Sequence, residues 1–348
     1  MSFFRLRVSK DERRRLWVLQ GWVVAVGIQV LVVAAHLYPV DLDRTATTAL
    51  ALFMAALLAQ TLTAHLAFFV LLVAGLAAWG RRWKLLIAAC PLSIWLLVVW
   101  TGMLWPATPP SPVGPALKVM SVNLLMVNRN HAPIVAEIRR EDPDLICFQE
   151  YTEHWHSALR KGLGGRYPHR EFICRSDSFG LAIWSKRPLL DVERRLPADG
   201  APPQALHSMQ LPAFRAEVEQ GGRRWAVYNI HLLPPRRLDY VLDQRAQFRA
   251  LVGRLQADSL PVLLTGDFNW NQYTWYHRRL KRLGLAEGHA QAGWGGGGTW
   301  PASGRLCYLP GLRLDHIYLR GLVCLAHRTG AALGSDHRAL IARVAEAE

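Results

Sequence analysis

Cysteine is scarce in this sequence, with five residues in 348. They show neither a close-spaced pair nor the spacing of a metal site, which argues against a structural zinc site. Cys90 and Cys147 lie within apolar runs, so packing is the simplest reading of both. A disulfide between Cys307 and Cys324 stays open, because spacing alone does not establish a bond in an oxidising compartment.

Internal repeats and coiled-coil heptads are also absent, which excludes solenoid and long coiled-coil architectures. The one glycine-rich stretch, GWGGGGTWPASG at residues 293–304, has no strand before it and no lysine after it. It therefore lacks the features of a phosphate-binding P-loop. We expect it to be a flexible surface connection.

Charge is confined to two short clusters within residues 16–105, and three apolar segments result. Leu16–Tyr38 and Leu85–Trp105 are each long enough to cross a bilayer, and Thr47–Trp79 is longer than one span needs. We interpret the middle segment as one tilted or overlong helix, because two crossings would each be too short. Residues 1–105 are therefore predicted to be a membrane anchor, an N-terminal bundle of three transmembrane helices.

The positions of the cations predict the orientation of this anchor. One basic cluster precedes the first span and another separates the second from the third, whereas the loop between the first two spans has only Arg44. By the positive-inside rule both clusters face the cytoplasm. We expect a multi-pass protein of the cell (inner) membrane with its catalytic domain on the extracytoplasmic side. Two crossings by residues 47–79 would place that domain inside instead.

Residues 106–116 form a proline-rich linker, and a different pattern begins at Leu117. In residues 117–348 short apolar strands alternate with amphipathic helices, as in HAPIVAEIRREDP and LDYVLDQRAQFRALVGRLQ. This order predicts an α/β domain in which two sheets pack on each other and are flanked by helices.

The net charge of +15 is shared by both regions. Residues 1–105 hold ten Lys and Arg against four Asp and Glu, a net +6, and the remainder holds 31 against 22, a net +9. A basic domain suits an anionic partner such as nucleic acid, lipid head groups or a phosphorylated small molecule. A solvated basic surface explains the same charge.

Polar residues recur where the expected strands of residues 117–348 end. A single one is usually a turn former or a helix cap, but six such strand ends are hard to explain as turns. The residues concerned are Asn123, Glu150, Asn229, His231, Asp267, Asn269, Asp315, His316, Ser335, Asp336 and His337.

The carboxylates and amides of this set suit a metal and a phosphate. Glu150 and Asp336 offer the hard oxygen ligands that Mg²⁺ or Mn²⁺ prefers in an open site. Asp267 can position or deprotonate a water, and Asn269 and Asn123 can hold a phosphate.

The histidines supply proton chemistry. His231 and His337 can donate to phosphate oxygens or move protons near neutral pH, and Asp315 can orient one of them. Together the set predicts metal-assisted hydrolysis of a phosphate ester.

The motifs SVN, DLICFQE, FGLAIWSKRPL, NIHL, GDFN, TWP, RLDHI and GSDHRAL occur in this order from Leu117 to Val344. In this order they resemble the endonuclease/exonuclease/phosphatase superfamily, which has the DNase I-like fold. The resemblance implies a four-layered α/β sandwich with the active site at one end of the paired sheets. The anchor before such a domain resembles bacterial membrane proteins of the superfamily, including those linked to glycopeptide resistance.

The resemblance also implies roles for the residues. Glu150 would be the principal metal ligand, with Asn123 beside it and Asp336 at a metal-site position. His231 would contact phosphate or act as an acid. The family's water- and phosphate-orienting pair would be Asp267 and Asn269, and its carboxylate–histidine pair Asp315 and His337. Leu125 departs from the pattern, because abasic-site repair nucleases have an aspartate there.

These observations lead to three hypotheses. The first is a membrane-anchored, divalent-metal-dependent phosphoesterase that hydrolyses a phosphodiester or phosphomonoester, on a lipid or polyprenyl phosphate close to the membrane outside the cytoplasm. The second is a surface nuclease acting on extracellular DNA or RNA, which the +9 charge of the domain favours. The third is a non-catalytic binding module on the same fold, which a complete set of polar positions disfavours.

Overall fold

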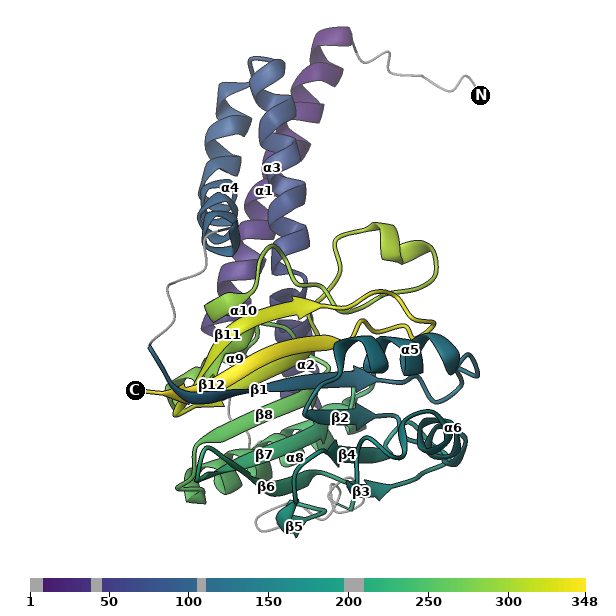
Figure 1. The fold of residues 1–348 in the computed structure, drawn as a ribbon. Helices are drawn as coiled ribbons and strands as arrows, with labels where there is room; N and C mark the ends of the chain where they lie inside the picture. Colours follow the sequence, from purple (N-terminus) through teal and green to yellow (C-terminus); the bar gives the residue numbers. More distant parts are fainter. Residues whose placement is uncertain (1–8, 39–45, 105–110, 197–209) are drawn as a thin grey trace. The chain divides into compact units, whose positions relative to one another are not determined.

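The structure is a computed structural model that describes residues 9–38, 46–104, 111–196 and 210–348 (Figure 1). The chain forms two compact units: a helical unit of residues 1–39 and 55–101, and a sandwich unit of residues 40–54 and 102–348. Arg5, Arg7, Arg44 and linker residues 106–110, on which parts of the sequence predictions rest, lie outside the described residues.

Three helices give the helical unit its core. The first, α1 (Lys10–Leu37), starts with a capping box in which Ser9 Oγ accepts the Glu12 N–H and the Glu12 carboxylate accepts the Ser9 N–H. Small and branched side chains of α1, α3 (Thr63–Trp79) and α4 (Trp83–Leu104) pack together, among them Val32, Ala67 and Ala89. The small alanine side chains allow the helices to approach one another closely.

A proline inside α4 is accommodated by a side chain from α1. Pro91 has no N–H and disrupts the local hydrogen bonds of α4. The Gln29 amide donates to the Ala88 carbonyl at 2.5 Å and accepts the Leu92 N–H at 3.1 Å. Backbone groups beside the proline are thereby paired without water, as an apolar environment requires.

The number of candidate membrane spans is smaller than the sequence suggested. Among the described residues, only Arg15–Leu37 of α1 is long and apolar enough to cross a membrane alone. The expected single helix over residues 47–79 is wrong: α2 (Thr47–Thr61) and α3 meet at a 57° bend and qualify only as a pair. The apolar part of α4, Trp83–Val99, is shorter than a span. One or two candidate spans thus replace the expected three.

Local chemistry accounts for the bend. Thr63 Oγ1 donates to the Ala59 carbonyl at 3.0 Å, a side-chain bond of the kind that bends helices. The first half of α2 also belongs to the sandwich unit, where the Phe53 ring lies edge-on to the Tyr276 ring at 5.9 Å. A run of apolar residues does not reveal such a break, because both helices are apolar on all sides.

Two mixed six-stranded sheets make up the sandwich (Figure 1). The first has the order β11-β12-β1-β2-β4-β3 and the second the order β5-β6-β7-β8-β10-β9. Each contains one parallel pair, β1 with β2 and β7 with β8, among antiparallel neighbours. The first sheet consists of β1 (Pro112–Asn123), β2 (Leu145–Gln149), β3 (His169–Ile173), β4 (Leu181–Ser185), β11 (Leu322–Thr329) and β12 (Leu340–Ala347). The second consists of β5 (Leu190–Glu193), β6 (Phe214–Gln220), β7 (Arg223–His231), β8 (Val262–Asp267), β9 (Ala286–Glu287) and β10 (Asp315–Arg320).

Helices cover the outer faces of both sheets, which gives four layers. Apolar residues such as Val119, Val227 and Leu263 fill the space between the sheets. On the first sheet lie α5 (Ala132–Glu141) and α6 (Glu153–Leu163), and Trp155 is among the residues they bury. On the second sheet lie α8 (Leu238–Ala257) and α9 (Trp275–Arg282), with Phe248 fully buried. The sheets and helices confirm the predicted α/β sandwich.

The start of the first strand differs from the sequence prediction, and the structure answers the question of a disulfide that the sequence left open. Strand β1 begins at Pro112, within the expected linker, and its register with β12 shifts between Val113 and Leu117. All five cysteines are free, so the structure contains no bond between Cys307 and Cys324.

The glycine-rich stretch lies partly at the surface, where Trp294 is 73% exposed, but another part of it is closely packed. It follows α10 (Gly288–Ala292) and precedes the short 3₁₀ helix η2 (Arg305–Tyr308). A Cβ added to Gly297, whose φ is 61°, would lie 2.4 Å from the His289 ring, and Thr299 is fully buried. Glycine is needed there because the backbone passes directly over the ring.

We expect Gly266→Ala to destabilise the sandwich strongly. The φ of Gly266 is 137°, and an added Cβ would lie 1.9 Å from the Ile230 carbonyl oxygen on neighbouring β7. Urea denaturation should show a loss of about 3 kcal/mol in the free energy of unfolding. Gly253→Ala is the matched control, because its Cβ in α8 would meet nothing within 4 Å. The control should gain about 1 kcal/mol, and equal losses in both variants would contradict the argument.

Candidate active site

The parallel strand pairs bring four polar residues to one end of the sandwich. Strand β1 ends at Asn123 beside the end of β2, which Glu150 follows directly. Strand β7 ends at His231 beside Asp267, the last residue of β8. Because parallel strands present their carboxyl ends at the same edge, each sheet delivers one pair of side chains.

Asn123 links the two sheets. Its Nδ2 donates to Asp267 Oδ2 at 3.0 Å and to Glu150 Oε1 at 3.3 Å. Glu150 has a φ of 57°, and its Oε2 accepts the Met126 N–H at 2.8 Å. A backbone strained in this way is typical of functional sites, and the turn after β1 holds the carboxylate in place.

Asp267 lies at the centre of the site. It is 1% exposed, and its Oδ2 lies 3.4 Å from His231 Nε2 and 3.6 Å from His337 Nε2. The other ring nitrogen of His231, Nδ1, is buried without a hydrogen-bond partner among the described residues. The Asp267 carboxylate thus lies between two histidine rings.

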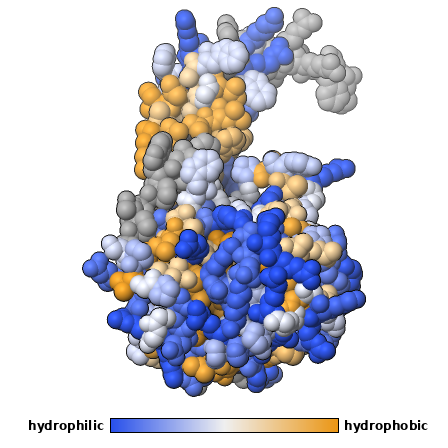
Figure 2. All heavy atoms as spheres, in the orientation of Figure 1, coloured by the Kyte–Doolittle hydropathy of each residue, from blue (hydrophilic) through white to orange (hydrophobic). Residues whose placement is uncertain are grey.

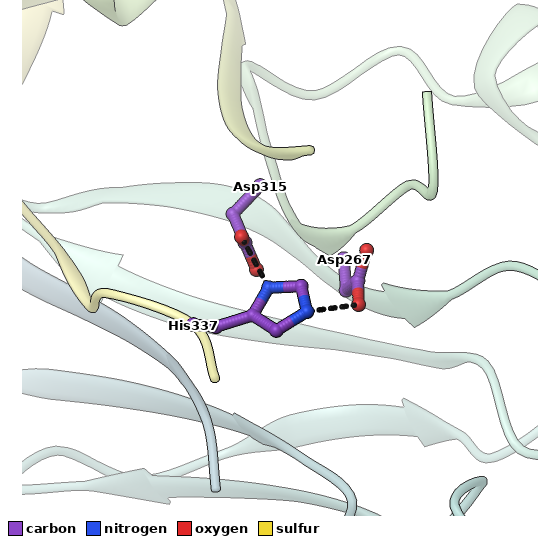
Figure 3. Close-up of side chains that lie close together, drawn as sticks. All are labelled: Asp267, Asp315 and His337. Atoms are coloured by element: carbon purple, nitrogen blue, oxygen red, sulfur yellow. Dashed lines mark hydrogen bonds and ion pairs between the residues drawn. The ribbon is translucent and has the colours of Figure 1, made fainter. Parts of the chain in front are cut away.

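His337 and Asp315 form a buried pair beside Asp267 (Figure 3). His337 Nδ1 lies 2.7 Å from Asp315 Oδ2, so the second ring nitrogen points at Asp267. Burial alone would lower the pKa of His337, but the carboxylates of Asp315 and Asp267 raise this pKa to about 10. At neutral pH the ring therefore carries a proton on both nitrogens, and its Nε2–H is a charged hydrogen-bond donor.

Two sets of residues could hold a divalent ion. Asp267, Asp315 and His337 bring three ligand atoms within 4.8 Å of one another. The 2.7 Å contact between His337 and Asp315 is, however, a charge-assisted hydrogen bond, and a protonated ring has no lone pair for a metal. The carboxylate of Glu150, to which Asn123 donates, is the better oxygen donor.

The side chains of Asp336 and Asn269 make no hydrogen bond to these residues in the described part of the chain, but the Asn269 backbone N–H donates to Asp267 Oδ1 at 2.9 Å. Asp336 Oδ2 accepts the Trp300 indole N–H at 3.2 Å, and its Oδ1 is buried without a partner among the described residues. An orphaned carboxylate oxygen of this kind suits a cation. Asn269, with a φ of 55°, donates its Nδ2 to the Leu232 carbonyl at 2.8 Å. This contact holds its side chain against the end of β7.

Two other strand-end residues of the sequence analysis lie outside the site. Asn229 is buried between the sheets, where it accepts from Gln149 Nε2 and donates to the Phe148 and Ala182 carbonyls. His316 follows Asp315 but points to the opposite face of β10, as alternation requires. Its two ring nitrogens lie 2.7 Å from Glu287 and 3.0 Å from the Trp270 carbonyl. Both residues have structural roles.

Three residues support the site in ways that sequence reasoning did not assign, although Ser335 was among the polar strand-end residues. The ring of Phe179 lies 5.1 Å from that of His231. Ser335 Oγ donates to the Asn123 carbonyl at 2.7 Å and accepts the His337 N–H at 3.1 Å. Thr299 supports the strand that carries Asp315. The TWP motif marks Thr299, but its hydroxyl could not be connected to Asp315 without the fold.

We expect Thr299→Val to weaken the site through Asp315. The Thr299 hydroxyl accepts the N–H groups of Leu314 at 3.0 Å and Asp315 at 3.2 Å. Valine has the same shape but leaves both donors unpaired, so the free energy of unfolding should fall by about 2 kcal/mol. Thermal melting and steady-state kinetics measure the two effects: kcat should fall while KM changes little. Thr299→Ser should restore both values; an unchanged kcat in Thr299→Val would show that Asp315 does not depend on this contact.

The sequence of the sandwich matches a known family. Residues 120–337 match the model of the Endonuclease/Exonuclease/phosphatase family. No curated protein matches the chain in sequence.

Several solved structures share the fold at low identity. An endonuclease/exonuclease/phosphatase from Beutenbergia cavernae DSM 12333 is 20% identical, with 67% of this chain and 72% of that chain covered and a TM-score of 0.54. The human Nocturnin catalytic domain with bound sulfate is 20% identical, with 68% and 96% covered and a TM-score of 0.51. A 3′ phosphatase from Neisseria bound to a product DNA hairpin is 21% identical, with 65% and 98% covered and a TM-score of 0.52. These likenesses confirm the DNase I-like fold.

Proposed function

The chain belongs to the endonuclease/exonuclease/phosphatase family, and from this premise we propose that it hydrolyses a phosphate ester with the help of a divalent metal. The observation that supports the proposal best is a continuous line of contacts across the sandwich. It runs from Glu150 through Asn123 to Asp267, and from Asp267 through His337 to Asp315. A proton acceptor, a charged hydrogen-bond donor and carboxylates that can bind a metal ion thus lie close together.

Each residue has a role in this proposal. Asp267 orients the attacking water and takes its proton, because it is buried and its Oδ2 faces both histidines. Attack forms a new bond from the water oxygen to phosphorus and breaks the bond to the leaving-group oxygen. His231, with an unpaired Nδ1, gives a proton to that oxygen. His337 donates from Nε2 to a phosphate oxygen and stabilises its developing charge.

The donor set fits Mg²⁺ or Mn²⁺. Glu150 would be the main ligand and Asn123 would lie beside it, with the unpaired Oδ1 of Asp336 as a further donor. Such an ion neutralises charge on the phosphate and lowers the pKa of a bound water.

We also propose that the N-terminal helices anchor the enzyme to the cell (inner) membrane with the catalytic site outside the cytoplasm. Support comes from α1, which is long and apolar enough to span, and from exposed apolar side chains on this unit (Figure 2). A tethered enzyme meets lipid-borne substrates at high local concentration. A lipid or polyprenyl phosphate is therefore the favoured substrate.

A nuclease or nucleic-acid phosphatase is the second candidate. The likeness to the Neisseria 3′ phosphatase, solved with a DNA hairpin, favours it, as does the basic charge of residues 106–348. Leu125, which takes the place of an aspartate found in abasic-site repair nucleases, argues against a repair role. A non-catalytic module is the weakest candidate, because the whole set of polar residues is present.

The full-length protein in detergent or nanodiscs tests the proposal. We expect it to hydrolyse a generic phosphodiester or phosphomonoester reporter with Mg²⁺ or Mn²⁺, and to lose this activity in EDTA. A panel of phospholipids, polyprenyl phosphates, single-stranded DNA and RNA then separates the first two candidates. Faster turnover of a lipid supports the membrane-proximal substrate, whereas faster turnover of nucleic acid supports the nuclease. No hydrolysis of any member would leave only the binding module.

A further inference from the structure

A groove in the helical unit combines three cations with an apolar wall. It has a volume of about 870 Å³ and lies between the first turns of α1 and the start of α4. Its cationic side chains are Arg15 of α1, Arg82 of the turn before α4, and Lys84 of α4. None of the three makes an ion pair with a side chain in the described part of the chain, and the nearby Glu12 carboxylate is bound to Ser9. Three like charges facing one groove repel one another unless an anion binds them.

The apolar wall lies deeper along both helices. Arg15, Leu19 and Trp22 are spaced i, i+4 and i+7, so they share one face of α1. Each residue advances the helix by about 1.5 Å, which places Trp22 about 10 Å below Arg15. On α4 a cation is again followed by an apolar residue, because Ile87 lies one turn beyond Lys84. Contact between Leu85 and the position of Gly21 shows that the two helices are neighbours at this level.

The cationic side chains of the groove lie at one end of the helical unit. In Figure 1 the start of α1 and the turn between α3 and α4 lie at the same end of the helical unit. Hydrophilic residues gather at that end and hydrophobic side chains follow below it on the face drawn in Figure 2. Trp79 and Trp83 at this end are 88% and 65% exposed. Exposed tryptophans beside lysine and arginine are typical of the level of lipid head groups.

We propose that this groove binds one anionic phospholipid. The phosphate of the lipid contacts Arg15, Arg82 and Lys84, and the first part of an acyl chain lies against Leu19, Trp22 and Ile87. Charge complementarity selects an anionic head group, and the apolar wall selects a lipid over a free phosphate. The inference rests on the proposed membrane anchoring but not on catalysis, because no residue of the groove belongs to the active site.

Native mass spectrometry of the full chain, released from micelles with added lipid, tests the proposal. The probes are phosphatidylglycerol as the anionic lipid and phosphatidylcholine as the zwitterionic one. We expect the wild type to retain one phosphatidylglycerol and no phosphatidylcholine. Soluble glycerol phosphate, which has the head-group charge without acyl chains, should not displace the lipid at equal concentration.

Matched variants locate the binding site. Arg15→Gln, Arg82→Gln and Lys84→Gln combined should weaken retention of phosphatidylglycerol about 100-fold, since each cation near an anionic lipid contributes about fivefold. The control combines Lys10→Gln and Arg13→Gln of α1 with Arg81→Gln of the turn before α4, which removes the same total charge but spares the groove. It should retain the lipid like the wild type. Ile87→Ser should weaken retention without any change of charge.

Three results would overturn the proposal: equal retention of both lipids by the wild type, equal loss in both triple variants, or displacement by glycerol phosphate. Hydrolysis of a soluble reporter by each variant shows whether it is folded. A failure of the catalytic proposal would abolish hydrolysis and leave lipid retention unchanged, so the two outcomes are distinguishable.

Discussion

His337→Gln is expected to lower kcat on a phosphoester reporter by about 10³-fold. The wild-type ring is held charged between Asp315 and Asp267, so its Nε2–H is a fixed donor in a buried site. Donors of this kind act mainly on the charge that develops in the transition state. Glutamine keeps a hydrogen-bonding side chain of moderate size but has no charge, and KM should therefore change much less than kcat.

The same substitution also breaks a buried ion pair. Asp315 and Asp267 are 2% and 1% exposed, and loss of the cation leaves their charges uncompensated. We expect the free energy of unfolding to fall by about 3 kcal/mol. A double variant, His337→Gln with Asp315→Asn, removes the charge of Asp315 and should recover much of this stability while kcat stays low.

The double variant separates catalysis from folding. Stability is measured by chemical denaturation, and kcat by steady-state kinetics at a temperature where every variant is folded. A return of activity together with stability in the double variant would show that His337 acts only through the fold.

The strand-end pattern predicted much of the site. Polar residues recur at the ends of the expected strands, which marked Asn123, Glu150, His231 and Asp267 as candidates. The parallel pairing that brings them together is seen in the structure. The same reasoning could not show that Asn229 has a structural role whereas His231, two residues later on the same strand, belongs to the site. Both side chains point to the same face of β7, because they are two positions apart. Which of them reaches the end of the sandwich depends on how the two sheets pack, and this packing is a long-range property.

The membrane segment and the glycine-rich stretch were harder to predict for a related reason. Composition detects apolar residues, but the bend at Leu62 depends on a hydroxyl bond and on packing of residues distant in sequence. Four glycines in a row resemble a flexible linker, yet at Gly297 the missing Cβ leaves room for the His289 ring. The contact from Phe53 to Tyr276 and the contact from Gly297 to His289 both involve a residue outside the local pattern.

Glu150→Gln is expected to raise the concentration of Mg²⁺ needed for half-maximal activity at least tenfold and to lower kcat at saturating Mg²⁺ by about 10²-fold. Glutamine fits the same space and can still accept the Met126 N–H, but it removes the negative charge that a hard cation requires. Its amide would also present a donor toward Asn123 Nδ2, which already donates to Glu150. The fold should be unaffected, since the side chain is only partly buried.

A matched control and an alternative site make this test decisive. Glu153→Gln makes the same change three residues later, on the exposed first turn of α6, and should leave the metal requirement unaltered. Activity is measured against Mg²⁺ concentration for the wild type and both variants.

An unchanged Mg²⁺ requirement in Glu150→Gln would mean that Glu150 is not the ligand. The cation would then be held by Asp267 and Asp315 with a deprotonated His337, a group of described residues whose ligand atoms converge. In that arrangement His337 could not be the charged donor, so Glu150→Gln also tests the role assigned to the histidine.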